Sequence, residues 1–350
     1  LATKSIREIM PKERSYSYAD GDQHFAWSPD GKWFLLNFLQ DKQWISQSGL
    51  VAADGSGEII DLSQSGYGAD EPRWSRNGQM MLYYSSRDGM KNHASWGGER
   101  DVYAMFFTQE AFDKYKLNQE EHDLLKGDKE EDDEEEEDEK SSKKEEKKEE
   151  DESIKEVKIE LEGIEDRKVR LTIHSSRLAD AHVSKKGDFL YYLARIEKGF
   201  DLWQTNLRTR ETKVFSKLGA RSVGQILSDK KERYLYILAD GKNHKIDIKK
   251  GEKSKVSNDG EMLLNEAKER KHLFEHVWRQ VQKKFYKIDL HEIDWDFYKK
   301  EYARFLPHIN NKQDFAEMLS EMLGELNASH TGARFRPRQK EKGSATASLG

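Results

Sequence analysis

The chain has 350 residues, of which 60 are Lys or Arg and 66 are Asp or Glu, giving a formal net charge of −6. Residues 128–152 hold 17 acidic and 6 basic residues, so this window carries −11 and the other 325 residues carry +5. That excess is too small for a nucleic-acid-binding surface, where a basic stripe is expected. The absence of cysteine excludes disulfide bonds, thiolate zinc sites and a cysteine nucleophile.

Neither a membrane span nor a signal peptide is predicted. No stretch approaches the run of about 18 apolar residues that a transmembrane helix needs, and the residues after Leu1 have no signal-peptide pattern. We therefore expect no membrane partner. Leu1 is not a methionine, and Ser-Leu-Gly at residues 348–350 has the character of an internal segment. We therefore expect a fragment or a processed chain.

A repeat extends over the first 260 residues. Four segments align without gaps, and each has an apolar run, a turn and a second apolar run: residues 25–36, 72–83, 181–192 and 225–236. The turn residues favour a tight reversal, and the aromatic and aliphatic residues after each turn favour a strand. The aligned serines, Ser28, Ser75, Ser184 and Ser228, lie 47, 109 and 44 residues apart. A period of about 45 residues with several short strands is typical of a propeller blade.

Further strands complete the predicted blades. We expect third strands at residues 49–54, 101–107, 201–207 and 244–248, and fourth strands at residues 58–62, 168–173 and 213–216. The predicted fold is multi-domain, with an incomplete all-β propeller of four visible WD40-like blades over residues 1–260, followed by a small α-helical domain. In this fold the aligned serines, together with Asp30 and Asp70, are expected to be turn residues and not catalytic groups.

The spacing of 109 residues predicts an insert within one blade, at residues 108–160. Its first part, residues 109–125, has helical character, with apolar residues such as Phe112 and Tyr115 among charged ones. Its second part is the acidic window 128–152, which cannot bury enough apolar surface to offset the entropy lost on ordering. We expect this window to be a disordered, solvated loop on a blade rim, in preference to an interaction tail.

After Gly260 the apolar period changes from 2 to 3.6 residues, which predicts a helical domain at residues 261–334. The predicted helices cover residues 266–286, residues 295–305 with Asp294 as N-cap, and residues 312–326 with Asn311 as N-cap. Residues 331–335 are expected to form a strand, and residues 335–350 a polar linker.

The segment His272-Leu-Phe-Glu-His276 matches the H-x-x-E-H pattern of zinc peptidases. Two histidines four residues apart share a helix face and could bind zinc, with Glu275 as the general base. The pair faces away from the apolar stripe of the same helix, which is formed by Leu273, Phe274, Val277, Trp278, Val281 and Phe285. No third ligand stands out, although the third predicted helix offers Glu317, Glu321 and Glu325. Two solvated histidines are therefore the favoured interpretation.

Residues 323–332, Leu-Gly-Glu-Leu-Asn-Ala-Ser-His-Thr-Gly, lie where the third helix ends and the predicted strand begins. Two rigid elements that meet at such a junction hold a side chain in a fixed place. Histidine is the usual general base near neutral pH, so His330 is a candidate catalytic residue. Ser329 is adjacent, but neighbours in a strand point to opposite faces. From local geometry alone, a structural histidine is the better interpretation.

The combination of these features resembles the tricorn-type serine peptidases, relatives of the C-terminal processing peptidases. Blades of the Ser28-Pro-Asp-Gly-Lys32 type precede a helical domain with Trp278, Phe285, Tyr286, Asp294, Trp295 and Tyr302, and this domain ends in Gly324-Glu-Leu-Asn-Ala-Ser-His330. The resemblance covers nearly the whole chain. It implies that His330 is the catalytic histidine and that Ser329 is a hydrogen-bonding member of a Ser/His/Ser/Glu tetrad.

The same resemblance implies the function. The nucleophilic serine and the glutamate would come from an α/β domain that comes after a PDZ-like domain, and nothing in this sequence matches either, so the chain alone is expected to be inactive. The expected activity is that of a serine endopeptidase that hydrolyses oligopeptides without a cofactor or metal, with the propeller guiding unfolded peptides.

The family implies a cytoplasmic homo-oligomer in the full-length form, or a periplasmic protein if a signal peptide has been lost. Two alternatives stay open. The first is a non-catalytic propeller scaffold that binds peptides or proteins. The second, less favoured, is a zinc peptidase that uses His272, Glu275 and His276.

Overall fold

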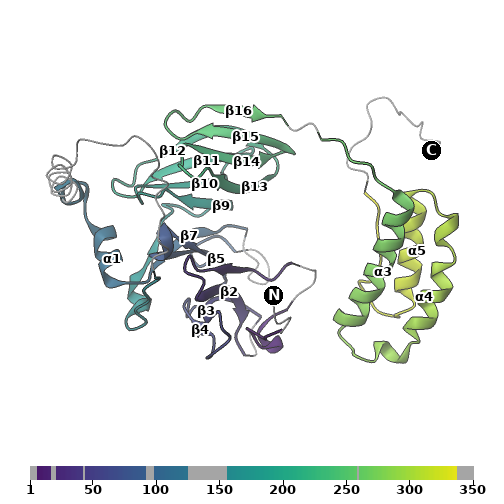
Figure 1. The fold of residues 1–350 in the computed structure, drawn as a ribbon. Coiled ribbons are helices and arrows are strands. Elements are labelled where there is room, and N and C mark those ends of the chain that lie inside the picture. Colours follow the sequence, from purple (N-terminus) through teal and green to yellow (C-terminus); the bar gives the residue numbers. More distant parts are fainter. Residues whose placement is uncertain are drawn as a thin grey trace, which may run out of the picture. The chain divides into compact units, whose positions relative to one another are not determined.

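The computed structural model describes residues 6–16, 21–41, 44–91, 98–124, 156–257 and 260–336. The chain divides into two compact units, Leu1–Asn258 and Asp259–Gly350. All strands of the described residues belong to the first unit, and three long helices belong to the second (Figure 1). The acidic window at residues 128–152, which we expect to be a solvated loop, lies outside the described residues.

The first unit consists of four antiparallel sheets of four strands, which succeed one another along the chain (Figure 1). Blades 1 and 2 consist of β1 (Phe25–Trp27), β2 (Trp33–Leu39), β3 (Ser46–Ala52), β4 (Ile60–Asp61), β5 (Ala69–Ser75), β6 (Met80–Ser85), β7 (Asp101–Phe106) and β8 (Lys168–Arg170). Blades 3 and 4 consist of β9 (Arg177–Val183), β10 (Phe189–Arg195), β11 (Phe200–Asn206), β12 (Thr212–Ala220), β13 (Val223–Ser228), β14 (Tyr234–Ala239), β15 (Lys242–Asp247) and β16 (Lys253–Val256). The sequential strand order confirms the predicted propeller blades.

The aligned repeats form the hairpin between the first and second strand of each blade. In blade 1 the Ser28 hydroxyl accepts hydrogen bonds from the backbone N–H groups of Lys32 at 3.1 Å and Trp33 at 3.0 Å. The Ser184 hydroxyl accepts the equivalent pair of bonds in blade 3. In blade 4 the carboxylate of Asp229 takes over this role. Ser28 and Ser184 are thus turn residues, as predicted.

In blades 2 and 3 the second strand is buried on both faces because neighbouring blades pack against it. Successive side chains of a strand point to opposite faces of the sheet. In β6, Met81 and Tyr83 join the core between blades 1 and 2, whereas Leu82 and Tyr84 join the core between blades 2 and 3. All six residues of this strand are buried. This packing explains why such strands are continuous apolar runs and not alternating ones.

The structure corrects several predicted boundaries. β3 begins three residues earlier than predicted, β4 has only two residues, and β12 continues to Ala220. β16 was missed because its four residues are all exposed and carry no alternating apolar pattern. In the insert, α1 (Gln109–Lys116) confirms the predicted helical character, and the Thr108 side chain is its N-cap. Ala111 and Tyr115 of α1 extend the core between blades 2 and 3.

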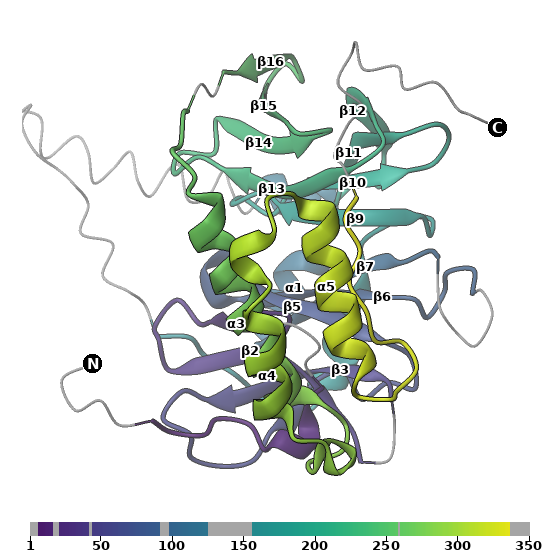
Figure 2. The same ribbon diagram turned by 90° about the vertical axis from the view of Figure 1, so that its right-hand side faces the viewer.

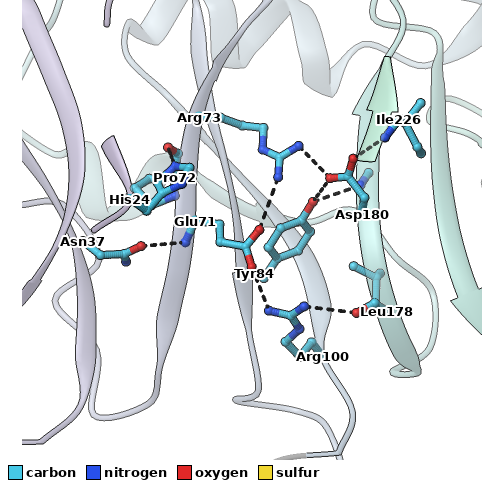
Figure 3. A network of polar contacts seen from close by, with 11 residues as sticks. His24, Asn37, Glu71, Pro72, Arg73, Tyr84, Arg100, Leu178, Asp180 and Ile226 are labelled. Carbon is cyan, nitrogen blue, oxygen red and sulfur yellow. Dashed lines mark hydrogen bonds and ion pairs between the residues drawn. The ribbon is translucent and has the colours of Figure 1, made fainter. Parts of the chain in front are cut away.

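A buried carboxylate links three blades (Figure 3). Asp180 of β9, whose side chain is 3% exposed, accepts hydrogen bonds from the guanidinium of Arg73 at 2.6 Å, the hydroxyl of Tyr84 at 2.8 Å and the backbone N–H of Ile226 at 2.5 Å. Arg73 and Tyr84 belong to blade 2, Asp180 to blade 3 and Ile226 to blade 4. Burial raises the pKa of Tyr84, so this phenol remains a hydrogen-bond donor near neutral pH.

A second polar contact joins blades 3 and 4. The ring of His182, in β9, lies 2.7 Å from one carboxylate oxygen of Glu232, and the backbone N–H of Lys185 donates to the other oxygen at 2.8 Å. Burial disfavours the charged form of Glu232, but these two bonds outweigh burial and lower the pKa of Glu232 below its ordinary value of 4.5.

The second unit contains α3 (Glu266–Lys284), α4 (Trp295–Ala303) and α5 (Lys312–Gly324), which lie side by side (Figures 1 and 2). The side chains of Asp294 and Asn311 cap α4 and α5 as predicted, by accepting hydrogen bonds from backbone N–H groups of the first turn. None of the helices in the described ranges is both long and apolar enough to cross a membrane.

Two tryptophans join α3 to α4. The indole N–H of Trp278 donates to the carbonyl of Trp295 at 3.2 Å, and the indole N–H of Trp295 donates to the carbonyl of Trp278 at 3.1 Å. Phe274 lies beside them in the same core and is 1% exposed. Leu273, predicted to share the apolar stripe, is instead 40% exposed, because it lies about 100° around the helix from Phe274.

We expect the Asp180→Ala substitution to destabilise the propeller by about 3 kcal/mol, because it leaves the partly buried Arg73 guanidinium and the Tyr84 hydroxyl without their acceptor. Urea unfolding followed by tryptophan fluorescence measures this loss. The matched control is Glu197→Ala, an exposed acid in the same blade, which should change stability by less than about 0.5 kcal/mol. Equal effects of the two substitutions would contradict the assignment.

Glu232 should make the stability of the propeller depend on pH in the acidic range. Because its pKa is lower in the folded chain than 4.5, its contribution is complete above that pH and is lost as the pH falls through the folded-state pKa. Glu232→Gln should therefore cost about 1 kcal/mol at about pH 6, and the cost should shrink as the pH is lowered. Urea midpoints across this range test the sign; a cost that grows on acidification would refute it.

Candidate functional site

The predicted catalytic dipeptide lies just beyond the end of α5. The helix ends at Gly324, and the side chain of Leu326 is fully buried in the core of the helical unit beside Phe274 and Met322. The backbone N–H of Leu326 donates to the carbonyl of Leu323 at 3.3 Å, which continues the last helical turn. The chain therefore leaves the core at a fixed point, three residues before Ser329.

Ser329 and His330 are exposed in the turn after this point. His330 has a backbone φ of 63°, in the left-handed region that non-glycine residues seldom occupy. Such conformations cluster at functional sites, where the surrounding structure holds them. Neither the Ser329 hydroxyl nor the His330 ring makes a hydrogen bond or an ion pair with another described residue. The ring is available to a group that approaches the turn.

The predicted strand at residues 331–335 is wrong. This segment has no regular secondary structure, because the described part of the helical unit contains no strand with which it could pair. Local contacts close the turn instead: the Thr331 hydroxyl donates to the carbonyl of Ala328 at 2.9 Å. Gly332 has a φ of 147°, and a Cβ atom there would lie 3.3 Å from the Ser320 hydroxyl. Ser329 and His330 therefore do not lie on opposite faces of a strand.

Glu325, directly after α5, is bound to α4. Its carboxylate accepts a hydrogen bond from the Tyr302 hydroxyl at 2.8 Å, and it also contacts Tyr298. Burial, together with the Glu325 carboxylate, raises the pKa of Tyr302 to about 12, so Tyr302 remains a donor near neutral pH. These bonds fix the end of α5 to α4 and occupy the glutamate that shortly precedes the candidate turn.

A contact from the loop between α3 and α4 reaches the same place. Nδ1 of His291 lies 2.9 Å from the carbonyl oxygen of Leu326, and Nε2 lies 2.5 Å from the Tyr286 hydroxyl. Tyr286 could be singled out in the sequence only through the family resemblance. His291 was missed, because it belongs to no motif and its partner is 35 residues away in the sequence.

Within residues 260–336, no third His, Asp or Glu side chain joins the histidine pair of α3 to form a group that could hold a metal ion. The rings of His272 and His276 are 6.3 Å apart, and His272 is exposed. Glu275, the candidate general base, forms an ion pair with Arg279 at 3.9 Å. The described residues contain no group of three His, Asp or Glu side chains that could hold a metal ion. The interpretation as two solvated histidines is favoured.

Three comparisons with known proteins each include a match related to the tricorn protease. Residues 266–324, which include α3, α4 and α5, match the family described as the tricorn protease C1 domain. A protein of Sulfurisphaera tokodaii, described as a putative tricorn-like protease C-terminal subunit, is 22% identical over 326 residues, which cover 87% of this chain and 34% of the relative. The crystal structure of the tricorn protease matches with a TM-score of 0.59 and 11% identity, over 88% of this chain and 29% of that chain.

These matches confirm the predicted resemblance and the predicted fold, a β-propeller followed by a helical domain. The chain spans about a third of the length of both relatives. The likeness to the solved structure concerns the fold alone. The family match ends at Gly324, shortly before the turn that carries Ser329 and His330.

Burial of Leu326 should govern the stability of the helical unit. We expect Leu326→Ala to cost about 2–5 kcal/mol, because it opens a cavity between α3 and α5 beside the candidate turn. Leu273→Ala on α3 is the matched control, and it should cost less than about 1 kcal/mol because Leu273 is largely exposed. Helical far-UV circular dichroism during unfolding measures both, because α3, α4 and α5 contain most helical residues of the described chain. A Leu326→Ala cost no greater than the control would contradict this packing.

Proposed function

We propose that this tricorn protease homologue is part of a serine peptidase that hydrolyses oligopeptides, and that His330 is its general base. One observation carries the proposal. His330 projects from a turn that is fixed at its origin by buried Leu326, while its ring has no partner among the described residues. A histidine used for structure is usually hydrogen-bonded, whereas a general base must be open to an incoming group.

The chemistry is a consequence of that placement. A serine hydroxyl that reaches the His330 ring would transfer its proton to a ring nitrogen while its oxygen attacks the peptide carbonyl. The protonated ring would then donate that proton to the leaving amine, and the same two steps with water would release the acyl group. We propose that Ser329 supports this cycle by hydrogen bonding within a tetrad. This role agrees with the exposed, unpaired hydroxyl that the turn presents beside His330.

The nucleophilic serine, the glutamate of the tetrad and the oxyanion hole belong, in this proposal, to another segment of the full-length protein. The support is that the chain spans about a third of its tricorn relatives. We further propose that the propeller guides peptides toward the site and that the full-length protein is a cytoplasmic homo-oligomer. These parts of the proposal rest on the family relationship.

The decisive substitution is His330→Ala in the full-length protein. We expect it to lower kcat for an oligopeptide substrate by about 10⁴-fold or more, because a serine nucleophile without its general base loses nearly all of its rate enhancement. His308→Ala is the matched control, since His308 is also an exposed histidine of the helical unit. It should leave kcat and KM unchanged.

Labelling with a fluorophosphonate provides a second measurement. The full-length wild-type protein should react with this serine-directed probe, and the His330→Ala variant should react far more slowly. The 350-residue chain alone should neither hydrolyse peptides nor take up the label. A full-length His330→Ala variant with wild-type activity would remove His330 from the mechanism. An inactive wild type that binds peptides would favour the scaffold function.

A further inference from the structure

The loop between α3 and α4 contains a strained turn. Leu290, His291 and Glu292 have φ values of 51°, 59° and 63°, so three successive non-glycine residues occupy the left-handed region. Each such residue costs about 1–3 kcal/mol and persists only where the surrounding structure determines its conformation. Here the Leu290 side chain is buried in the helical core, and the Asp289 carboxylate accepts the backbone N–H of His291 at 3.1 Å. These contacts hold the turn and fix the direction of the His291 side chain.

The ring of His291 has a defined hydrogen-bonding arrangement. A carbonyl oxygen can only accept, so Nδ1, at 2.9 Å from the Leu326 carbonyl, must carry a hydrogen and donate it. Nε2 lies against the Tyr286 hydroxyl at 2.5 Å, and the Phe285 ring meets the imidazole edge-on with centroids 5.2 Å apart. The imidazole is therefore held by contacts with three residues.

The Leu326 carbonyl is a group that needs a partner. A buried backbone carbonyl is shielded from water and must find a donor within the protein. Leu326 lies two residues beyond the end of α5, and the whole residue is buried. His291 supplies the donor from a different element. The bond thus fixes the peptide group through which the chain passes from the core into the exposed turn.

The backbone N–H groups of Leu326 and Asn327 donate to the carbonyls of Leu323 and Gly324 in the last turn of α5. Among the described residues, His291 is the one side chain of another element that bonds the main chain of residues 326–330. Tyr302 acts on the side chain of Glu325, one residue earlier. The Thr331 hydroxyl bonds the Ala328 carbonyl, but Thr331 belongs to the turn itself. The His291 bond to Leu326 is therefore the side-chain contact that ties the backbone of residues 326–330 to the rest of the helical unit.

We propose that His291 is a positioning residue: by donating to the Leu326 carbonyl, it sets the place and direction from which Ser329 and His330 meet their partners. This inference rests on the proposed function, because His330 is the group being positioned. His291 itself does not touch the reacting atoms. Displacement of a catalytic group by about 1 Å can cost about 100-fold in rate, so loss of this contact should act on kcat.

A matched pair of substitutions separates positioning from folding. His291→Asn keeps a hydrogen-bond donor near the position of Nδ1, and asparagine tolerates the left-handed backbone. His291→Asp has the same shape and the same backbone tolerance, but it offers the Leu326 carbonyl an acceptor in place of a donor. In the full-length protein we expect the Asn variant to keep kcat within about 5-fold of wild type. The Asp variant should lose about 10- to 100-fold in kcat with little change in KM.

Histidine resonances of the 350-residue chain supply a readout that does not depend on activity. In protein labelled with ¹³C-histidine, the Cε1–H signal of His330 should be unchanged in His291→Asn and should shift or broaden in His291→Asp. Helical far-UV circular dichroism shows whether each variant keeps α3, α4 and α5. If the Asp variant fails to fold, Tyr286→Phe, which loosens the ring without removing Nδ1, should still perturb the His330 signal.

Failure of the proposed function can be distinguished from failure of the positioning role of His291. Wild-type activity in His330→Ala overturns the proposed function, and the resonance measurement then still tests whether His291 orders the turn. Loss of activity in His330→Ala with equal kcat in the Asn and Asp variants keeps the proposed function and overturns the role of His291. An unshifted His330 signal in a folded Asp variant also overturns it.

Discussion

Burial of both faces of the middle strands in blades 2 and 3 is the constraint on which the packing of the blades depends. A middle strand such as β6 has no solvent-facing side, so its residues divide between two cores and cannot include unpaired polar groups. Most buried polar side chains lie instead in first and third strands and in turns, as Asp180, Gln47 and Ser28 do. Asp180 is fully engaged, because it accepts hydrogen bonds from blades 2 and 4. Apolar packing is non-directional, whereas the hydrogen bonds of Asp180 have defined directions. These bonds therefore fix how blades 2, 3 and 4 pack against one another.

The helical unit also depends on burial and on directed hydrogen bonds, and here they hold the start of an exposed turn. Trp278 and Trp295 join α3 to α4 by reciprocal hydrogen bonds, and Leu326 is buried in the same unit. The chain therefore leaves this rigid core at a defined peptide group, that of Leu326. The turn beyond that exit point is exposed and carries a histidine whose ring has no partner among the described residues. In an isolated turn such a side chain would sample many directions. Anchoring immediately before it removes much of that freedom without covering the ring.

Local signals in the sequence account for the features that could be predicted. The serine-centred turns, the apolar second strands and the N-caps Asp294 and Asn311 are each set by a few adjacent residues. The features that were predicted wrongly or missed depend on pairing partners outside the local sequence. The strand expected at 331–335 needed a pairing partner that the described part of the helical unit does not contain, and β16 is recruited by pairing with β15 and not by its own pattern. Asp180 was missed because its partners lie 46 to 107 residues away in the sequence. His291 was missed because Leu326 lies 35 residues away. Ser329 and His330 could be named as candidates through the family resemblance, but the contacts that fix the start of their turn were not visible in the sequence.

A catalytic unit assembled from two parts of a protein places a particular demand on the part that supplies the base. Any freedom left in the turn must be lost when the serine arrives, and each backbone residue ordered at that moment costs about 1–2 kcal/mol. The helical unit removes that cost in advance, since the bonds to Glu325 and to the Leu326 carbonyl form on folding and do not need the partner segment. The left-handed residues at 290–292 belong to the same arrangement. Their strain is sustained by the core around Leu290, and they direct the His291 donor at the carbonyl from which the candidate turn begins.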